Sequence, residues 1–273
     1  MSVDKRQKLK SLLDTVPSGT LVDSKWMRRN QISDSLCHDY AQRGWLHRLA
    51  QGVYIRPEKE FHPTKLIDWR ILAVSMHKIM EIDFHVGGMT AIELHGLQHY
   101  IRMSGKQPVQ IYAEKLPGWL EKIDANAVFQ PRSLKLFSDP KQGIGSLRNQ
   151  TPGLGGEINF PVSTPERAIL EVLDMLPKEV GFDHLDKVFE SLYNLSPRKL
   201  MPLLQSCRKV KIIRLFFAFA DRHRHAWLKY LDKDSLDFGK GDRQFFKGGK
   251  IHPEYRITLP QTFFDSEHGD IHE

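Results

Sequence analysis

Apolar and polar positions between Ile32 and Gly44 recur with the period of an α-helix. At about 100° per residue, one side of this helix carries the residues expected to pack, with Cys37 at the border: Ile32, Leu36, Cys37 and Tyr40. The opposite side carries Ser35, His38 and Gln42. Ser33 is a favourable N-cap and Gly44 suits the left-handed position that ends a helix. The pattern therefore predicts a helix from Ser33 to Arg43 with one packed face and one free face.

The flanking residues extend this helix into a compact module. Asp23 and Ser24 are good N-caps for a short basic helix at residues 25–29. After the second helix, residues 45–49 alternate apolar and polar side chains, residues 50–52 can turn, and residues 53–55 return as a second strand. An amphipathic helix at residues 4–16 precedes the module. This order predicts a winged helix-turn-helix whose hairpin is the wing.

Beyond residue 57 the pattern predicts a mixed α+β domain. The polar stretch 57–63, bracketed by prolines, is the expected linker. Helices are expected at residues 64–80, with Leu66 among the buried side chains, and at residues 89–94. The expected strands are 82–86, 99–102, 109–113, 127–130, 134–137 and 157–162. Most connections are too short for crossovers, so we expect a mostly antiparallel sheet, and residues 138–156 are expected to form a mobile loop.

The C-terminal part is predicted to be helical. Residues 163–166, Ser-Thr-Pro-Glu, have the composition of a capping box with proline in the first turn of a helix. Further helices are expected at residues 182–192, 197–207 and 210 to about 229, the last being apolar nearly all round and therefore central. The predicted fold class is α+β. It places a winged helix-turn-helix at residues 1–57 and a larger mixed α/β domain at residues 64–273, with an antiparallel sheet and a helical part at about 163–231.

Composition and charge narrow the class of protein. The chain has 273 residues, 40% of them hydrophobic and 27% charged, and no apolar run approaches the roughly 20 residues of a membrane span. The N-terminus has no apolar signal core, so a cytoplasmic protein is expected. The net charge of +7 is uneven. Residues 1–57 carry ten Lys and Arg against five Asp and Glu, and residues 197–256 carry fifteen against six. Both basic regions are expected to attract polyanions.

The free face of the second helix is the candidate nucleic-acid reader. In helix-turn-helix proteins this face lies in the DNA major groove, while cations on the preceding helix and on the wing meet phosphates. The candidate DNA-binding residues are Lys25, Arg28, Arg29, Ser33, Ser35, His38, Gln42, Arg43, Arg48, Gln51 and Arg56. Helix-turn-helix modules also mediate protein contacts, which is the alternative. Asp34 and Asp39 weaken the electrostatic case, and each is a helix-dipole or salt-bridge partner or an acceptor for a cytosine amino group.

The second basic region predicts a surface for an anionic partner, which the charge by itself does not identify. Its candidate residues are Lys199, Arg208, Lys209, Lys211, Arg214, Arg222 and Arg224. Cys37 and Cys207 lack metal-ligand spacing, and the His95 and His99 pair lacks a third ligand. We therefore expect no metal, no cofactor and no catalytic residues. The alternative from a different class is a nucleic-acid-processing enzyme that the winged helix delivers to its substrate.

Several segments in this order resemble the AbiEi antitoxins of bacterial abortive-infection, type IV toxin-antitoxin systems, which serve in phage defence. They are Gly44-Trp45-Leu46, Gln51-Gly52-Val53-Tyr54, Gly88-Met89-Thr90-Ala91, Ser163-Thr164-Pro165-Glu166-Arg167-Ala168 and the glycine-rich tail that ends at Tyr255-Arg256-Ile257-Thr258-Leu259-Pro260. The resemblance covers nearly the whole chain.

The resemblance implies two activities. The winged helix would bind inverted repeats in double-stranded DNA of its own promoter and repress transcription, with residues 33–43 and 45–56 corresponding to the DNA-reading helix and the wing. The C-terminal domain would neutralise a cognate toxin of the AbiEii type, which is similar to a nucleotidyltransferase. No family motif assigns this neutralisation to single side chains.

Overall fold

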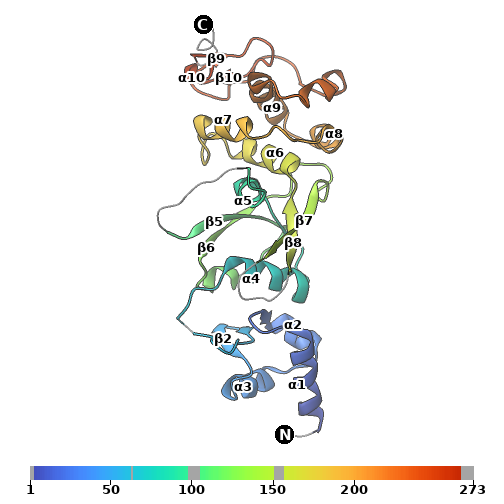
Figure 1. The fold of residues 1–273 in the computed structure, drawn as a ribbon, viewed down its shortest axis with the longest axis vertical. Coiled ribbons are helices and arrows are strands. Elements are labelled where there is room, and N and C mark those ends of the chain that lie inside the picture. The colour runs from blue at the N-terminus through green and yellow to red at the C-terminus, as the bar shows by residue number, and fades with distance from the viewer. Residues whose placement is uncertain (1–2, 63, 98–104, 151–156, 266–273) are drawn as a thin grey trace. The chain divides into compact units, whose positions relative to one another are not determined.

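The computed structural model describes residues 3–62, 64–97, 105–150 and 157–265 (Figure 1). Its internal contacts divide the chain into two compact units. The first comprises Met1–His85, Arg102–Arg132 and Ser146–Val162, and the second comprises Val86–Ile101, Ser133–Gly145 and Ser163–Glu273. The proposed division at residues 57–64 stays a prediction.

The first unit begins with three helices and a small antiparallel sheet. The elements are α1 (Val3–Thr15), β1 (Leu21–Asp23), α2 (Ser24–Arg29), α3 (Asp34–Gln42), β2 (His47–Ala50) and β3 (Val53–Ile55). The sheet has the order β1-β3-β2, with Leu21 opposite Ile55 and Asp23 opposite Val53. The three residues of β1 are too short to show alternation, which is why the sequence pattern did not predict this strand.

These elements enclose a core that also includes a residue from beyond the expected linker at residues 57–63. Leu36 and Tyr40 of α3 pack with Trp26 and Met27 of α2, and Ile79 is part of the same buried cluster. The Leu21 amide also donates to Ser75 Oγ at 2.9 Å. Residues 75–79 therefore contribute to the packing of the N-terminal elements.

The helix expected at residues 64–80 differs from its prediction. The α-helix α4 (Trp69–Val74) begins only after Asp68, whose carboxylate accepts from the Arg70 amide at 2.8 Å, and it continues as the π-helical segment η1 (Ser75–Ile79). Leu66 precedes the helix and is 43% exposed, so its predicted burial is wrong. Trp69 of α4 contacts Phe160, with ring centroids 5.6 Å apart.

A five-stranded sheet has the order β6-β5-β4-β8-β7. Its strands are β4 (His85–Val86), β5 (Gln107–Tyr112), β6 (Ala127–Arg132), β7 (Ile144–Gln150) and β8 (Glu157–Ser163). β5 and β6 are parallel, with Gln107 opposite Ala127 and Tyr112 opposite Arg132. This pair departs from the mostly antiparallel sheet that was expected, because residues 113–126, which include the 3-10 helix η2 (Leu120–Lys122), form a connection long enough to return the chain to the same end.

Three other expectations for this region need correction or lie outside the described residues. Strand β7 occupies part of the segment expected to be a loop, since residues 144–150 pair in the sheet. Residues 134–137 form no strand, and Phe137 makes only an isolated bridge to Cys207. The strand expected at residues 99–102 and the last part of the expected loop, residues 151–156, lie outside the described residues.

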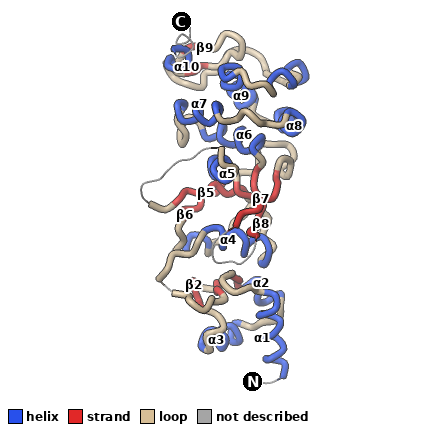
Figure 2. Tube along the Cα trace, viewed as in Figure 1, coloured by secondary structure: helices blue, strands red, loops and turns tan. Residues whose placement is uncertain are grey.

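The second unit is mainly helical. Its helices are α5 (Gly88–Leu94), α6 (Pro165–Met175), α7 (Phe182–Glu190), α8 (Pro197–Ser206), α9 (Val210–His223) and α10 (Gln261–Asp265), with short 3-10 turns η3 (Leu228–Tyr230) and η4 (Lys233–Ser235) and a two-stranded antiparallel sheet of β9 (Lys250–Ile251) and β10 (Thr258–Leu259). Helix α6 contacts α5, α8 and α9, and α7 contacts α9 (Figure 2). Residues 212–220 of α9 are all buried, which agrees with the prediction of a central helix. The helix ends at His223, before a left-handed Arg224, and not near residue 229.

The helix start at residues 163–166 has a different physical basis from the expected capping box. Thr164 is the N-cap, and no side-chain hydrogen bond caps the helix. Ser163 and Glu166 are buried instead, and Glu166 Oε1 accepts from the Ser196 amide at 3.0 Å. Glu171, 1% exposed, accepts from Arg167 Nε at 2.7 Å, Ser163 Oγ at 2.8 Å and the Gly88 amide at 2.9 Å. This stretch therefore joins α5 and α6 through a buried polar network.

Candidate nucleic-acid interface

Helix α3 presents an open polar face. Leu36, Cys37 and Tyr40 are buried, whereas Ser35, His38 and Gln42 are exposed. His38 Nε2 and Gln42 Nε2 lie 3.1 Å apart, as expected for polar neighbours four residues apart on one helix face. Ser33 Oγ accepts from the Leu36 amide at 3.3 Å and so caps the helix. The face thus carries hydrogen-bonding side chains that are open to a partner.

The neighbouring helix α2 carries cations. Asp23 Oδ1 accepts from the Trp26 amide at 2.8 Å, which fixes the start of α2. Lys25 and Arg28 are exposed, and neither takes part in an ion pair among the described residues. Arg29 differs, because its guanidinium donates to the Met80 carbonyl at 2.8 Å and pairs with Glu81 at 3.1 Å. Lys25 and Arg28 are therefore the cations of α2 that are available to an anion.

The tip of the hairpin is attached to the start of α2. The Gly52 carbonyl accepts from the Ser24 amide at 2.8 Å and from Ser24 Oγ at 3.0 Å. Gly52 has a φ of +73°, and a Cβ there would approach Ser24 Oγ to 2.3 Å, so glycine is required both by conformation and by space. This attachment holds the exposed Gln51 next to α2, while Arg48 is exposed on β2.

Two further N-terminal residues are explained by local contacts. Arg56 was predicted to meet phosphate, but its Nη1 donates to the Leu13 and Val16 carbonyls at 2.5 and 2.6 Å, at the end of α1. Arg56 thus holds α1 against β3. Asp39 pairs with Lys5 at 3.4 Å, in agreement with a salt-bridge partner. Arg43 and Trp45 are exposed at the end of α3, and Trp45 is an aromatic side chain that sequence reasoning did not select.

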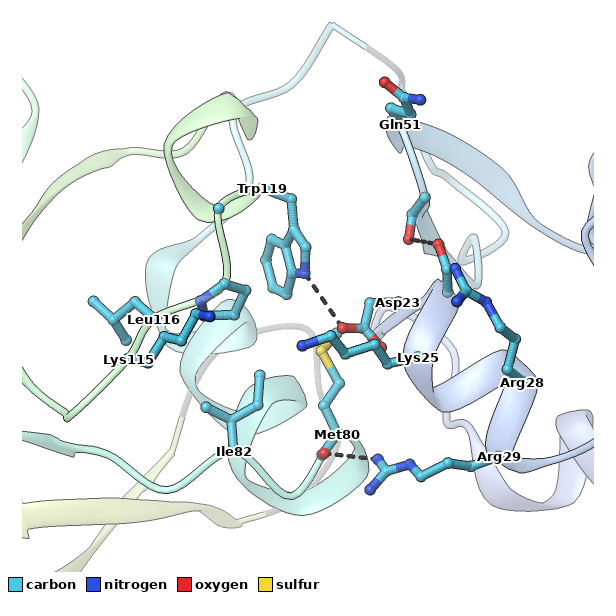
Figure 3. A pocket seen from close by; sticks show the side chains of 14 residues that line it. Asp23, Lys25, Arg28, Arg29, Gln51, Met80, Ile82, Lys115, Leu116 and Trp119 are labelled. Atoms are coloured by element: carbon cyan, nitrogen blue, oxygen red, sulfur yellow. Dashed lines mark hydrogen bonds between the residues drawn. The ribbon is translucent and has the colours of Figure 1, made fainter.

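A pocket of about 510 Å³ lies beside α2, within the first unit. The residues that line it come from α2, the hairpin tip, the segment after η1 and the loop after β5: Asp23, Ser24, Lys25, Arg28, Arg29, Gln51, Gly52, Met80, Ile82, Lys115, Leu116, Pro117, Gly118 and Trp119. Figure 3 shows Lys115 and Leu116 on one side, Arg28 and Gln51 on the other, and Asp23 and Trp119 between them. Trp119 Nε1 donates to Asp23 Oδ2 at 3.4 Å. No sequence pattern connected residues 115–119 with α2.

The structure places the candidate cations of the second basic region in different environments. Arg214 is 3% exposed, and its guanidinium donates to the carbonyls of Phe238, Gly241 and Arg256 at 2.7 to 2.9 Å, so its placement on a surface is wrong. Lys209 donates to both oxygens of Asp174 at 2.6 Å.

The remaining cations of that region fall into two groups. Lys211 lies 3.9 Å from Asp174, and Arg222 pairs with Asp186 at 3.0 Å. Lys199, Arg208 and Arg224 are exposed. Whether these exposed cations meet a toxin stays a prediction.

Histidine and cysteine side chains have structural contacts. His95 Nε2 lies 2.9 Å from the Ser163 carbonyl, and His99 lies outside the described residues. Burial raises the pKa of the Cys37 and Cys207 thiols to about 11, and both are free. Within the described ranges, no group of three or more His, Cys, Asp and Glu side chains could hold a metal ion. No helix there is long and apolar enough to cross a membrane.

Comparisons with known proteins define the class of the chain. Residues 5–103 match the family model described as "Transcriptional regulator, AbiEi antitoxin N-terminal domain", and residues 106–260 match the model described as "Transcriptional regulator, AbiEi antitoxin, Type IV TA system". The class is therefore that of the transcriptional regulators. Within it, the chain belongs to the AbiEi antitoxin family of type IV toxin-antitoxin systems, which confirms the resemblance found in the sequence.

The comparison of folds gave a similar crystal structure, that of the RV2827C protein from Mycobacterium tuberculosis. The TM-score is 0.55 at 13% sequence identity, over 98% of this chain and 96% of that chain. At this identity the likeness concerns the fold alone. A comparison with curated proteins gave no match.

Proposed function

We propose that the chain is an antitoxin and transcriptional autorepressor, and that residues 1–57 form a winged helix-turn-helix that binds inverted repeats in its own promoter. In this proposal α3 enters the major groove, where Ser35, His38 and Gln42 meet base edges. Lys25, Arg28 and Arg48 meet phosphates on either side. The hairpin of β2 and β3 is the wing.

One observation carries the proposal: α3 has an exposed polar face, and exposed cations outside ion pairs lie on the adjacent α2. The order of elements supports it, because α1, β1, α2 and α3 are followed by a hairpin that pairs with β1. Membership of a family of transcriptional regulators supports it independently.

Fluorescence anisotropy with the duplex upstream of the chain's own coding sequence tests the proposal. We expect His38→Ala or Gln42→Ala to reduce base preference by roughly 1 to 3 kcal/mol at one position per half-site. Arg28→Ala should weaken binding to every sequence alike, because phosphate contacts carry no base information. Wild-type affinity should fall steeply with salt as counterions are displaced.

Arg198→Ala is the matched control, since it removes the same charge from an exposed site in the second unit that belongs to neither set of candidate residues. Its affinity for DNA should equal that of the wild type. Equal effects of the base-face and phosphate variants on sequence preference would refute the assignment of faces. Salt-insensitive binding would refute DNA recognition by these cations.

We further propose that residues 64–273 neutralise a cognate AbiEii-like nucleotidyltransferase toxin, by direct contact or by opposing its effect. Family membership supports this. The test is co-expression with the neighbouring toxin gene in a growth assay and a pull-down. The variant that separates repression from neutralisation is Arg28→Ala combined with Gln42→Ala in the full chain. Deletion of residues 1–57 is unsuitable, because it would expose Ile79, which is part of the N-terminal core. We expect loss of repression with neutralisation retained, and loss of both would refute the division of labour.

A further inference from the structure

The pocket beside α2 brings a cation of the later sequence next to the cations of the N-terminal helices. Lys115 is exposed and lines the same pocket as Lys25 and Arg28, although nearly ninety residues separate it from Arg28 in sequence. We call this pocket the α2–loop cleft. Its lining includes four cationic side chains, Lys25, Arg28, Arg29 and Lys115, and the single carboxylate of Asp23.

The carboxylates of Asp23 and Glu81, near the α2–loop cleft, already have hydrogen-bond or ion-pair partners in the protein. Asp23 is 6% exposed, and its two oxygens accept from the Trp26 amide and Trp119 Nε1. Glu81 pairs with Arg29. Glu114 neighbours Lys115 in sequence but does not line the cleft. Lys25, Arg28 and Lys115 take part in no ion pair among the described residues, so the cleft retains an excess of positive charge.

The loop that carries Lys115 is held in place. The bond between Trp119 Nε1 and Asp23 Oδ2, at 3.4 Å, connects this loop to the residue that caps α2. β5 precedes the loop and is fixed by its parallel pairing with β6. The ammonium group of Lys115 is therefore presented to the cleft from a supported position.

We propose that the α2–loop cleft takes a phosphate group of the DNA backbone, with Lys115 as a contact that lies outside the winged helix. The inference rests on the proposed DNA binding and extends its surface. Lysine binds phosphate as a point charge, so Lys115 raises the affinity for every duplex and does not select a sequence. The nucleic-acid surface then includes residues from both segments matched by the family models, 5–103 and 106–260.

The experiment measures salt-dependent affinity of the full chain by fluorescence anisotropy. The probes are the labelled upstream duplex and a scrambled duplex of the same length and composition. We expect Lys115→Ala to weaken binding to both duplexes on the order of fivefold and to reduce the slope of log affinity against log salt by about 1, since one phosphate contact is lost. Lys115→Arg should retain most of the affinity because it keeps the charge.

Lys106→Ala is the matched control. Lys106 is an exposed lysine that precedes the six residues of β5, roughly 20 Å of strand before the loop, and it pairs with Asp124 at 2.7 Å. Its removal should leave the slope unchanged. If Lys115→Ala equals Lys106→Ala while Arg28→Ala still weakens binding, the inference is wrong and the proposed function stands. Weakening of the upstream duplex alone would overturn the phosphate assignment. If the wild type binds no duplex, both proposals fail.

Discussion

Residues 1–57 and residues 197–256 are both basic in sequence, with net charges of +5 and +9, but their cations are placed differently. In the first region Lys25, Arg28, Arg43 and Arg48 are exposed and outside ion pairs of the described residues. In the second, Arg214 lies in the core and Lys209 and Arg222 pair with carboxylates, while Lys199, Arg208 and Arg224 are exposed. An excess of Lys and Arg over Asp and Glu in a segment therefore indicates an anion-binding surface only where these cations have no partner inside the protein.

The cations that have partners inside the protein hold parts of the chain together. Long basic side chains in the second region join helices to the irregular C-terminal segment, as Arg214 joins α9 to the carbonyls of Phe238, Gly241 and Arg256. In the first region Arg56 does the same, because its guanidinium donates to the carbonyls of Leu13 and Val16 at the end of α1. Substitutions at paired cations should change stability, and substitutions at free cations should change binding.

Arg214→Ala should have the largest effect on stability. It removes a buried guanidinium and leaves three carbonyls without their donor, so we expect a loss on the order of 3 to 5 kcal/mol in the free energy of unfolding. Urea denaturation followed by circular dichroism measures this. Arg208→Ala removes an exposed arginine of the same region and should change stability by less than about 0.5 kcal/mol. Equal stability of the two variants would contradict the structural role of Arg214.

Arg56→Ala should have the next largest effect. Two hydrogen bonds from a charged group are lost at the end of α1, which predicts a loss of about 1 to 3 kcal/mol in unfolding free energy. At temperatures where the variant stays folded, its affinity for the upstream duplex should equal that of the wild type. Arg48→Ala on the neighbouring strand should show the reverse, with unchanged stability and weaker binding. A stable Arg56→Ala protein that binds DNA poorly would restore Arg56 to the interface.

The smallest effect concerns pH and the pair between Asp186 and Arg222. Burial alone would raise the pKa of Asp186, but the hydrogen bond from His223 and the charge of Arg222 outweigh it and lower that pKa. The carboxylate therefore contributes stability above its unfolded pKa of about 4, and this contribution is lost as the pH falls through the lower, folded pKa.

Asp186→Asn tests this dependence. The unfolding free energies of wild type and variant should differ at pH 7, and the difference should shrink progressively below pH 4. Urea denaturation at several pH values provides the measurement. A difference that is constant with pH would show that the loss comes from packing and not from charge.

The sequence predicted helices more accurately than the sheet. Helices α3, α6 and α7 begin within about two residues of their expected positions, because apolar periodicity and capping residues act within a few residues of the chain. β1 was missed, and the parallel pairing of β5 and β6 was not expected. Strand pairing depends on which distant segment supplies the hydrogen bonds, and single-sequence patterns contain no such information.

At the candidate site, too, the sequence predicted local features and missed contacts between distant segments. Face analysis selected Ser35, His38 and Gln42, which are exposed, because the side of a helix on which a residue lies follows from its position in the repeat. It could not select Lys115, since the proximity of that lysine to α2 depends on a contact between Trp119 and Asp23. The face analysis also could not show that the Arg56 guanidinium donates to the carbonyls of Leu13 and Val16.

The sequence by itself determined the local elements and, through the order of its segments, the family. Only the tertiary structure decided which charges are free. Ser163 and Glu166 illustrate this, because both were expected to cap a helix and are buried instead, Ser163 donating to Glu171 and Glu166 accepting from the Ser196 amide. The physical reason is that capping depends on neighbours along the chain, whereas neutralisation and burial of a charge depend on groups that folding brings from far away.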